Sequence, residues 1–140
     1  MRSYEATATI AAAPEEVWRL LVDGRTWPSW DSGVTAVEGA IAPGGTVRIR
    51  TEAAPGRAFP VRVTAFEAPS RLEFTGGMPL GLFRGVRTHT LTPDGAGTHF
   101  RVREEYSGPL LGLVWRSMPD LQPSFDRFAA GLKDRAESGA

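Results

Sequence analysis

The chain opens with a strict alternation of apolar and polar residues. Between residues 3 and 10 every second position is apolar, which is typical of a strand with one buried face. These positions are Tyr4, Ala6, Ala8 and Ile10. At Pro14 the period becomes helical, because a proline followed by two glutamates favours a helix start. A short helical corner is expected over residues 27–31.

Residues 34–107 have the pattern of several strands separated by turns. Short apolar stretches alternate with polar residues, as in half-buried strands. Breaks that contain proline or glycine fall at residues 43–45, 55–56, 69–70 and 76–77. The connections are too short for crossover helices, so the strands are expected to pair antiparallel.

The last two of these strands are predicted to form a hairpin. Residues 93–97 read Pro-Asp-Gly-Ala-Gly, a strong turn signal. Phe100 and Val102 mark the inner face of the second strand and place Glu104 on it. Only an even-numbered turn pairs inner residues with each other. The expected partners are Arg87 with Glu104, His89 with Val102, and Leu91 with Phe100.

After residue 109 the period is helical again. The apolar stripe is Val114, Met118, Leu121, Phe125, Phe128 and Leu132. It predicts one helix of about 25 residues, about 37 Å long. Pro119 and Pro123 lie inside it, and a proline removes a backbone hydrogen bond and clashes with the preceding turn. We therefore expect a kink or break near 119–123, with the stripe kept in phase.

Composition excludes several kinds of protein. The 140 residues carry 16 basic and 16 acidic side chains, so the net charge is zero and nucleic acid is not an expected partner. Cysteine is absent, which removes disulfides, thiolate metal sites and cysteine nucleophiles. The two histidines, His89 and His99, fall on opposite faces, so no metal site is expected. No cofactor is expected either.

Targeting signals are not apparent in the sequence. The first residues are not followed by a continuous apolar run, so neither a signal peptide nor a membrane span is expected. We expect a single domain over residues 1–140, in the cytoplasm, as a monomer or a homodimer.

The order of elements predicts an α+β fold. A long amphipathic helix needs a surface as long as itself, and only the concave face of a curved sheet provides one. The sequence resembles the helix-grip fold of the START-like (SRPBCC) superfamily, especially its polyketide cyclase/dehydratase and lipid-transport branch. The resemblance is carried by residues 13–18, 27–30, 71–74 and 97–108. It implies a curved antiparallel sheet of about seven strands around a long C-terminal helix, with short helices between the first two strands.

The resemblance also implies an apolar cavity between sheet and helix, which binds lipids, polyketides or other hydrophobic molecules. We therefore expect a hydrophobic or aromatic small molecule as ligand. Trp30, Trp115 and the apolar loop 76–83 are expected to flank the cavity mouth, and this loop is predicted to be a flexible lid or a dimer contact. The candidate ligand-binding residues are Phe74, Arg87, His89, Leu91, Phe100, Val102, Glu104, Tyr106, Trp30, Met78, Phe83, Trp115, Met118, Leu121 and Phe125.

Three polar residues of the predicted inner face carry the candidate chemistry. A carboxylate in an apolar groove must be paired or protonated, and Arg87 is the expected partner of Glu104. One interpretation is a structural ion pair beside a cavity-lining His89. In the other, Arg87 holds a ligand carboxylate or enolate while Glu104 or His89 acts as acid or base in a cyclisation or dehydration. An arginine beside Glu104 favours the charged carboxylate, which makes His89 the better catalytic candidate.

Three functions follow from these residues. The first is binding of a hydrophobic small molecule without chemistry. The second is an enzyme, namely a cyclase, aromatase or dehydratase that uses His89, Glu104 and Arg87. The third is a protein-interaction module, which predicts an exposed apolar patch around loop 76–83 and Trp115.

Overall fold

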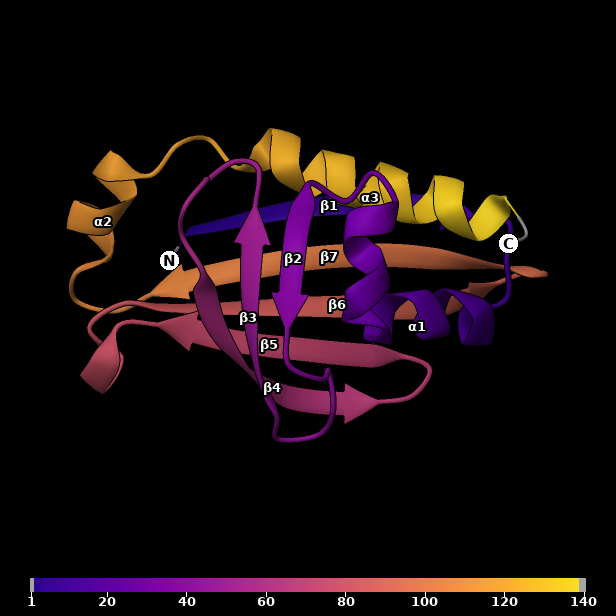
Figure 1. Cartoon of the computed structure of the whole chain (residues 1–140), viewed down its shortest axis with the longest axis horizontal. Coiled ribbons are helices and arrows are strands. Elements are labelled where there is room, and N and C mark those ends of the chain that lie inside the picture. The colour runs from indigo at the N-terminus through magenta and orange to yellow at the C-terminus, as the bar shows by residue number, and fades with distance from the viewer. Residues whose placement is uncertain (1, 139–140) are drawn as a thin grey trace.

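Seven antiparallel strands curl around one face of a C-terminal helix in the computed structural model, which describes residues 2–138 (Figure 1). The strands are β1 (Arg2–Ile10), β2 (Val34–Glu38), β3 (Thr46–Thr51), β4 (Phe59–Glu67), β5 (Arg71–Gly77), β6 (Arg84–Asp94) and β7 (Gly97–Ser107). Their order in the sheet is β1-β7-β6-β5-β4-β3-β2. The first strand therefore pairs with the last, and β1 and β2 form the two edges of the sheet.

The helices lie where the change of period predicts them. They are α1 (Pro14–Val22), α2 (Leu111–Ser117) and α3 (Gln122–Glu137), with the 3-10 segments η1 (Gly24–Ser29) and η2 (Pro79–Gly81). Pro14 begins α1, with Glu15 and Glu16 in its first turn, where the helix dipole favours acidic side chains. The predicted corner near residue 27 is η1.

The predicted hairpin and its register are confirmed. β6 and β7 are joined by a two-residue turn, in which Gly95 has a φ of 61°. The even turn keeps inner residues opposite inner residues. The observed partners are Arg87 with Glu104, His89 with Val102, and Leu91 with Phe100.

The C-terminal segment is broken into two helices rather than bent. α2 ends at Ser117, because Pro119 forces the residue before it into extended backbone, with φ −76° and ψ 136° at Met118. Pro123 does not interrupt α3 but stands in its first turn, where a proline is tolerated. The prediction that one apolar stripe stays in phase throughout is wrong before Leu121, since α2 buries no residue.

Side chains of α3 form hydrogen bonds with backbone groups of the edge strand β1 and of Ala11, the residue that follows it. The Gln122 amide donates to the carbonyl oxygen of Glu5 at 2.8 Å, and the Lys133 ammonium donates to that of Thr9 at 2.6 Å. The Glu137 carboxylate accepts from the backbone N–H of Ala11 at 2.8 Å. These contacts hold α3 along the edge of the sheet and leave fewer free polar groups there.

Aromatic rings fill the space between the middle of α3 and the sheet. The Phe128 ring of α3 lies 5.1 Å from Trp27, 5.9 Å from His89 and 6.3 Å from Phe100, measured between ring centres. The Phe74 ring of β5 lies 5.3 Å from His89. This part of the interior is therefore packed with side chains. None of the described helices is long and apolar enough to cross a membrane.

Candidate functional site

The predicted ion pair lies on the inner face near the α2 end of the sheet. Both Nε and Nη2 of Arg87 lie 2.8 Å from Oε1 of Glu104, and the two side chains are 33% and 17% exposed. The Arg87 guanidinium also lies over the Phe125 ring of α3, at 4.6 Å from its centre. The pair therefore borders the aromatic interior with its charges mutually compensated.

A glycine on β6 makes room for the Glu104 carboxylate. A Cβ added at Gly85 would lie 2.5 Å from Oε2 of Glu104, closer than any real contact. Gly85 is not among the site residues predicted from the sequence. The sequence did contain an indication of this role, because a glycine inside a strand often marks a close approach by another group.

Next to the ion pair stands a buried hydroxyl without a partner. Tyr106 is 3% exposed, and its hydroxyl lies close to the Glu104 carboxylate without making a hydrogen bond of good geometry to any described residue. Burial raises the pKa of the Tyr106 phenol, and the negative charge of Glu104 raises it further. The phenol therefore remains a neutral hydrogen-bond donor at physiological pH.

Three aromatic rings surround the Tyr106 side chain. The Tyr106 ring lies 6.1 Å from Tyr4, 5.9 Å from Phe83 and 5.7 Å from Trp115, and Trp115 stacks on Tyr4 at 5.3 Å. Phe83 and Trp115 were predicted here, whereas Tyr4 was not predicted as a site residue. Its signal was the alternation that placed it on the inner face of β1.

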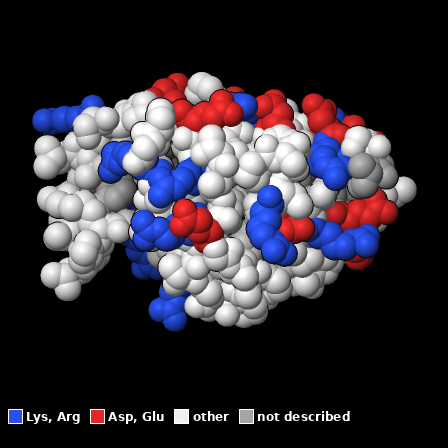
Figure 2. Space-filling view, in the orientation of Figure 1, with Lys and Arg blue, Asp and Glu red and all other residues white. Residues whose placement is uncertain are grey.

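Helix α2 covers this end of the molecule with few contacts of its own. It buries no residue, and Leu113 is 66% exposed. Figure 1 shows α2 beyond the end of α3, joined to it by an extended connection. In Figure 2 the corresponding lobe carries mainly uncharged atoms, while basic and acidic side chains lie side by side over the body of the molecule. Trp115 is thus the main link between α2 and the sheet.

His89 lies deeper, within the packed core. The ring is 1% exposed, and its Nδ1 donates to the carbonyl oxygen of Leu72 at 3.2 Å. Burial, together with the positive charge of Arg87, lowers the pKa of the imidazole to about 3. His89 is therefore neutral at physiological pH and has no proton to spare for an acid step.

The remaining predicted residues divide into buried and peripheral positions. Four are core side chains of the sheet, namely Phe74, Leu91, Phe100 and Val102. Trp30 is half-buried beside Phe128, at 5.4 Å between ring centres, and its buried indole N–H makes no hydrogen bond to the described residues. Met118 and Leu121 are half-buried in the connection between α2 and α3.

The loop 76–83 is less uniformly exposed than the sequence suggests. Leu80 is 96% exposed and Met78 43%, but Leu82 and Phe83 are half-buried. A surface hollow of about 660 Å³ adjoins this loop, and a second of about 340 Å³ lies over β6 and β7. Arg84 borders both. The described residues contain no cluster of three or more histidine or acidic side chains able to hold a metal ion.

This architecture is the helix-grip fold of the START-like superfamily, in which a curled antiparallel sheet holds a C-terminal helix. The sequence matches, over residues 1–137, the model of a family described as polyketide cyclase / dehydrase and lipid transport. Because this match covers nearly the whole chain, the protein belongs to that family. No curated protein matches the sequence.

Solved structures of the same fold come from several bacteria. A protein from Mesorhizobium loti is similar with a TM-score of 0.77 at 21% identity, and 99% of each chain is covered. A START superfamily protein from Mycobacterium smegmatis is similar with a TM-score of 0.70 at 16% identity, again over 99% of each chain. The Aha1 dimer from Colwellia psychrerythraea is similar with a TM-score of 0.76 at 18% identity, over 99% of this chain and 98% of that one. At these identities the likeness establishes the fold alone.

Proposed function

We propose that this protein binds a hydrophobic or aromatic small molecule between α3 and the inner face of the sheet, in the cytoplasm. One observation carries the proposal, namely the buried Tyr106 hydroxyl, which lies close to the Glu104 carboxylate but makes no hydrogen bond of good geometry to the described residues. An unpaired buried hydroxyl costs about 1–3 kcal/mol, and folded proteins rarely keep one without a use. A ligand that accepts a hydrogen bond from Tyr106 removes this cost.

The neighbouring ion pair determines which polar group of a ligand can bind beside Tyr106. The charge of Arg87 is compensated by Glu104, with both contacts made to Oε1. Oε2 lies beside Gly85, which has no side chain to displace it. The site therefore offers a donor at Tyr106 and an acceptor at Glu104, an arrangement suited to a carbonyl or hydroxyl group. The apolar body of the ligand supplies most of the affinity, at about 25 cal/mol per Å² buried.

Access to this site lies at the α2 end. The rings under the middle of α3 are in contact, so a ligand must enter where the covering element is held least. Helix α2 buries no residue and rests on the sheet mainly through Trp115. Displacing α2 separates Trp115 from Tyr4 and opens the polar end first.

The proposal is tested by a search for compounds that stabilise the protein, followed by removal of the Tyr106 hydroxyl group. Neutral aromatic compounds that bear a carbonyl or hydroxyl group are expected to raise the melting temperature. Tyr106→Phe should weaken the binding of such a compound about tenfold, the loss expected for one hydrogen bond. Tyr4→Phe, the matched control in the same aromatic group, should leave the affinity unchanged.

Two results would count against binding. One is that no apolar compound stabilises the protein and native mass spectrometry of material from its own host shows no bound molecule. The other is that every ligand found binds equally well to the Tyr106→Phe variant, which would place the ligand elsewhere.

A second candidate function is acid–base catalysis at the same place. The adjacent Glu104 carboxylate and Tyr106 phenol favour it, because together they can accept and donate a proton in a cyclisation or dehydration. The buried, neutral His89 is a weaker candidate than the sequence suggested. Unchanged turnover of a true substrate by both Glu104→Gln and Tyr106→Phe would exclude this role.

A further inference from the structure

The outer face of the sheet carries two arginines without acidic partners. On strands β4 to β7 the other outward arginines form ion pairs: Arg71 with Glu67 and Glu73, and Arg101 and Arg103 with Glu5. Arg62 and Arg84 are exposed and make no ion pair with any described residue. Two arginines without an ion pair therefore stand on strands β4 and β6, whereas the other outward arginines of β4 to β7 are paired.

These two arginines stand at the hollow of about 660 Å³, together with residues of β4, β5 and the β5–β6 loop. In the sheet register Arg62 faces Thr75, and Arg84 faces Gly77, so strand β5 runs between them. Neighbouring strands lie about 4.8 Å apart, which separates β4 from β6 by about 10 Å. Arg84 is also displaced by two residues along the strands, so the two arginines start about 12 Å apart, a distance that two arginine side chains can span to reach one group above Thr75 and Gly76.

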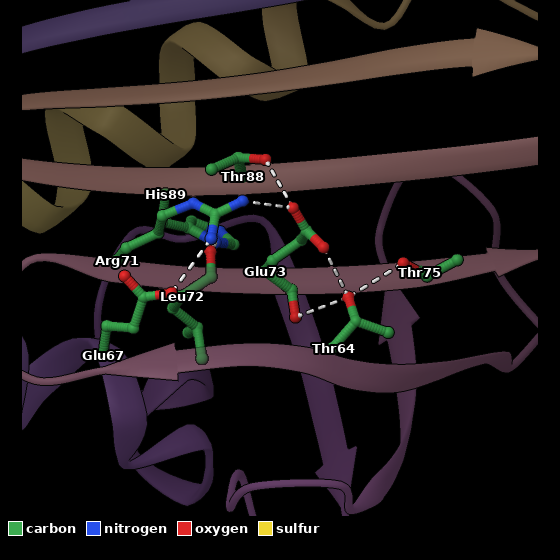
Figure 3. Close-up of polar contacts among 8 residues, drawn as sticks. All are labelled: Thr64, Glu67, Arg71, Leu72, Glu73, Thr75, Thr88 and His89. Atoms are coloured by element: carbon green, nitrogen blue, oxygen red, sulfur yellow. Dashed lines mark hydrogen bonds and ion pairs between the residues drawn. The ribbon is translucent and has the colours of Figure 1, made fainter.

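The hydroxyl groups of Thr64 and Thr75 line the same hollow as the two arginines. Figure 3 shows the contacts of Thr64 with Thr75 and Glu73. Thr64 donates to Oε1 of Glu73 at 2.8 Å and lies 2.9 Å from the Thr75 hydroxyl. Because the only hydroxyl proton of Thr64 goes to Glu73, Thr75 donates to Thr64 and can turn its proton to an incoming acceptor. The Glu73 charge is met by Arg71 at 2.8 Å, so it opposes an anion only weakly.

An apolar wall completes the hollow. It is formed by Met78, Pro79 and Phe83 of the β5–β6 loop. The backbone N–H of Met78 donates to the carbonyl oxygen of Phe83 at 2.8 Å, and Gly77 has a φ of 135°, which allows the close turn. The wall is therefore held in place, although 43% of Met78 remains exposed.

We propose that this outer hollow binds an organic anion, with its oxyanion held by Arg62, Arg84 and Thr75 and its apolar body against Met78 and Pro79. Arginine matches such a group well, because its planar guanidinium donates two parallel hydrogen bonds to an oxyanion. The neutral polar group on the inner face offers no net positive charge. The outer site thus differs from the inner one in ligand charge and does not depend on it.

The probe is naphthalene-2-sulfonate, compared with the neutral naphthalene-2-sulfonamide. Titration of ¹⁵N-labelled protein with the sulfonate should shift the amide signals of Thr64, Thr75, Gly76 and Gly77 in a saturable manner. The sulfonamide should bind at least tenfold more weakly, and added salt should weaken only the sulfonate.

Substitution of single arginines identifies the side chains that bind the sulfonate. Arg62→Ala and Arg84→Ala should each raise the dissociation constant of the sulfonate about tenfold, as expected for loss of one charge-assisted contact. Arg48→Ala is the matched control, because Arg48 is exposed on the neighbouring strand β3 and makes no ion pair with the described residues. It should leave the dissociation constant unchanged.

Several outcomes would overturn the outer site. They are the absence of saturable binding, equal binding of the sulfonamide, unchanged affinity in the Arg62→Ala and Arg84→Ala variants, and amide shifts confined to inner-face residues such as Phe74 and His89. Neutral ligands that lose affinity in Tyr106→Phe test the inner site separately, so either proposal can fail alone.

Discussion

Acidification from pH 7 to pH 5 is expected to destabilise this protein through one buried imidazole. Burial, and then the nearby charge of Arg87, lowers the pKa of His89 from 6.5 to about 3 in the folded state. Between these two pH values the unfolded chain binds a proton on His89 and the folded chain does not. The stability that the neutral ring contributes is therefore complete above pH 6.5 and is lost as the pH falls toward 3.

The size of the effect follows from the two pKa values. Between pH 7 and pH 5 the unfolded imidazole passes from mostly neutral to almost fully protonated, while the folded one stays neutral. Integrating the proton difference over this interval gives a loss of about 2 kcal/mol in the free energy of unfolding. Each further pH unit down to the folded pKa adds about 1.4 kcal/mol.

Denaturant unfolding of three proteins at pH 7 and pH 5 measures this loss. His89→Asn keeps an N–H donor for the Leu72 carbonyl but cannot titrate, so its loss should be about 2 kcal/mol smaller than that of the wild type. His99→Asn removes the exposed histidine of the outer face and should behave as the wild type does. Comparing each protein with itself at two pH values cancels the cost of the substitution.

A direct measurement covers the case in which His89→Asn fails to fold. The His89 ring signals of the wild type in NMR spectra should not titrate between pH 7 and pH 5. Equal losses of stability in all three proteins, or a His89 ring that titrates near pH 6.5, would refute the assignment of a packed, neutral imidazole.

Three further substitutions test individual features by denaturant unfolding at pH 7. Tyr106→Phe should stabilise the ligand-free protein by about 1 kcal/mol, because it removes a buried hydroxyl without a partner, and an unchanged or lower stability would contradict that view. Gly85→Ala should cost about 1–3 kcal/mol by displacing the Glu104 carboxylate, and a cost that persists in a Glu104→Ala background would point to another cause. Leu80→Asn should stabilise by up to about 1 kcal/mol, because Leu80 has a φ of 61° and asparagine tolerates the left-handed region better. A destabilised Leu80→Asn variant would indicate a contact made by this leucine.

Much of the fold was predictable because its strands are half-buried. Alternation along β6 and β7, together with the requirement for an even turn, determines which residues face each other. The same argument predicts the pairing of Arg87 with Glu104 from the sequence alone. Local pattern suffices here because a one-residue slip would move every apolar side chain of the hairpin to the wrong face.

Other features depend on contacts that no local pattern contains. The prolines indicated a break near Pro119, but the direction of α2 follows from the extended connection between Met118 and Leu121. Residue types alone did not show that His89 would be packed between rings rather than left beside a cavity. The unpaired Tyr106 hydroxyl and the room left by Gly85 emerge only when three strands and α2 come together.

Because the first strand pairs with the last, β1 remains unpaired during synthesis until β7 has been made. β1 is made first, yet its partner β7 follows about 90 residues later, and α3, which occupies its free edge, later still. At about 5–20 residues per second, β1 remains without its sheet neighbour for roughly 4–18 s. During that interval an emerging chain exposes an unpaired, half-apolar strand, so chaperone binding to residues 2–10 would protect the newborn protein from association with its neighbours.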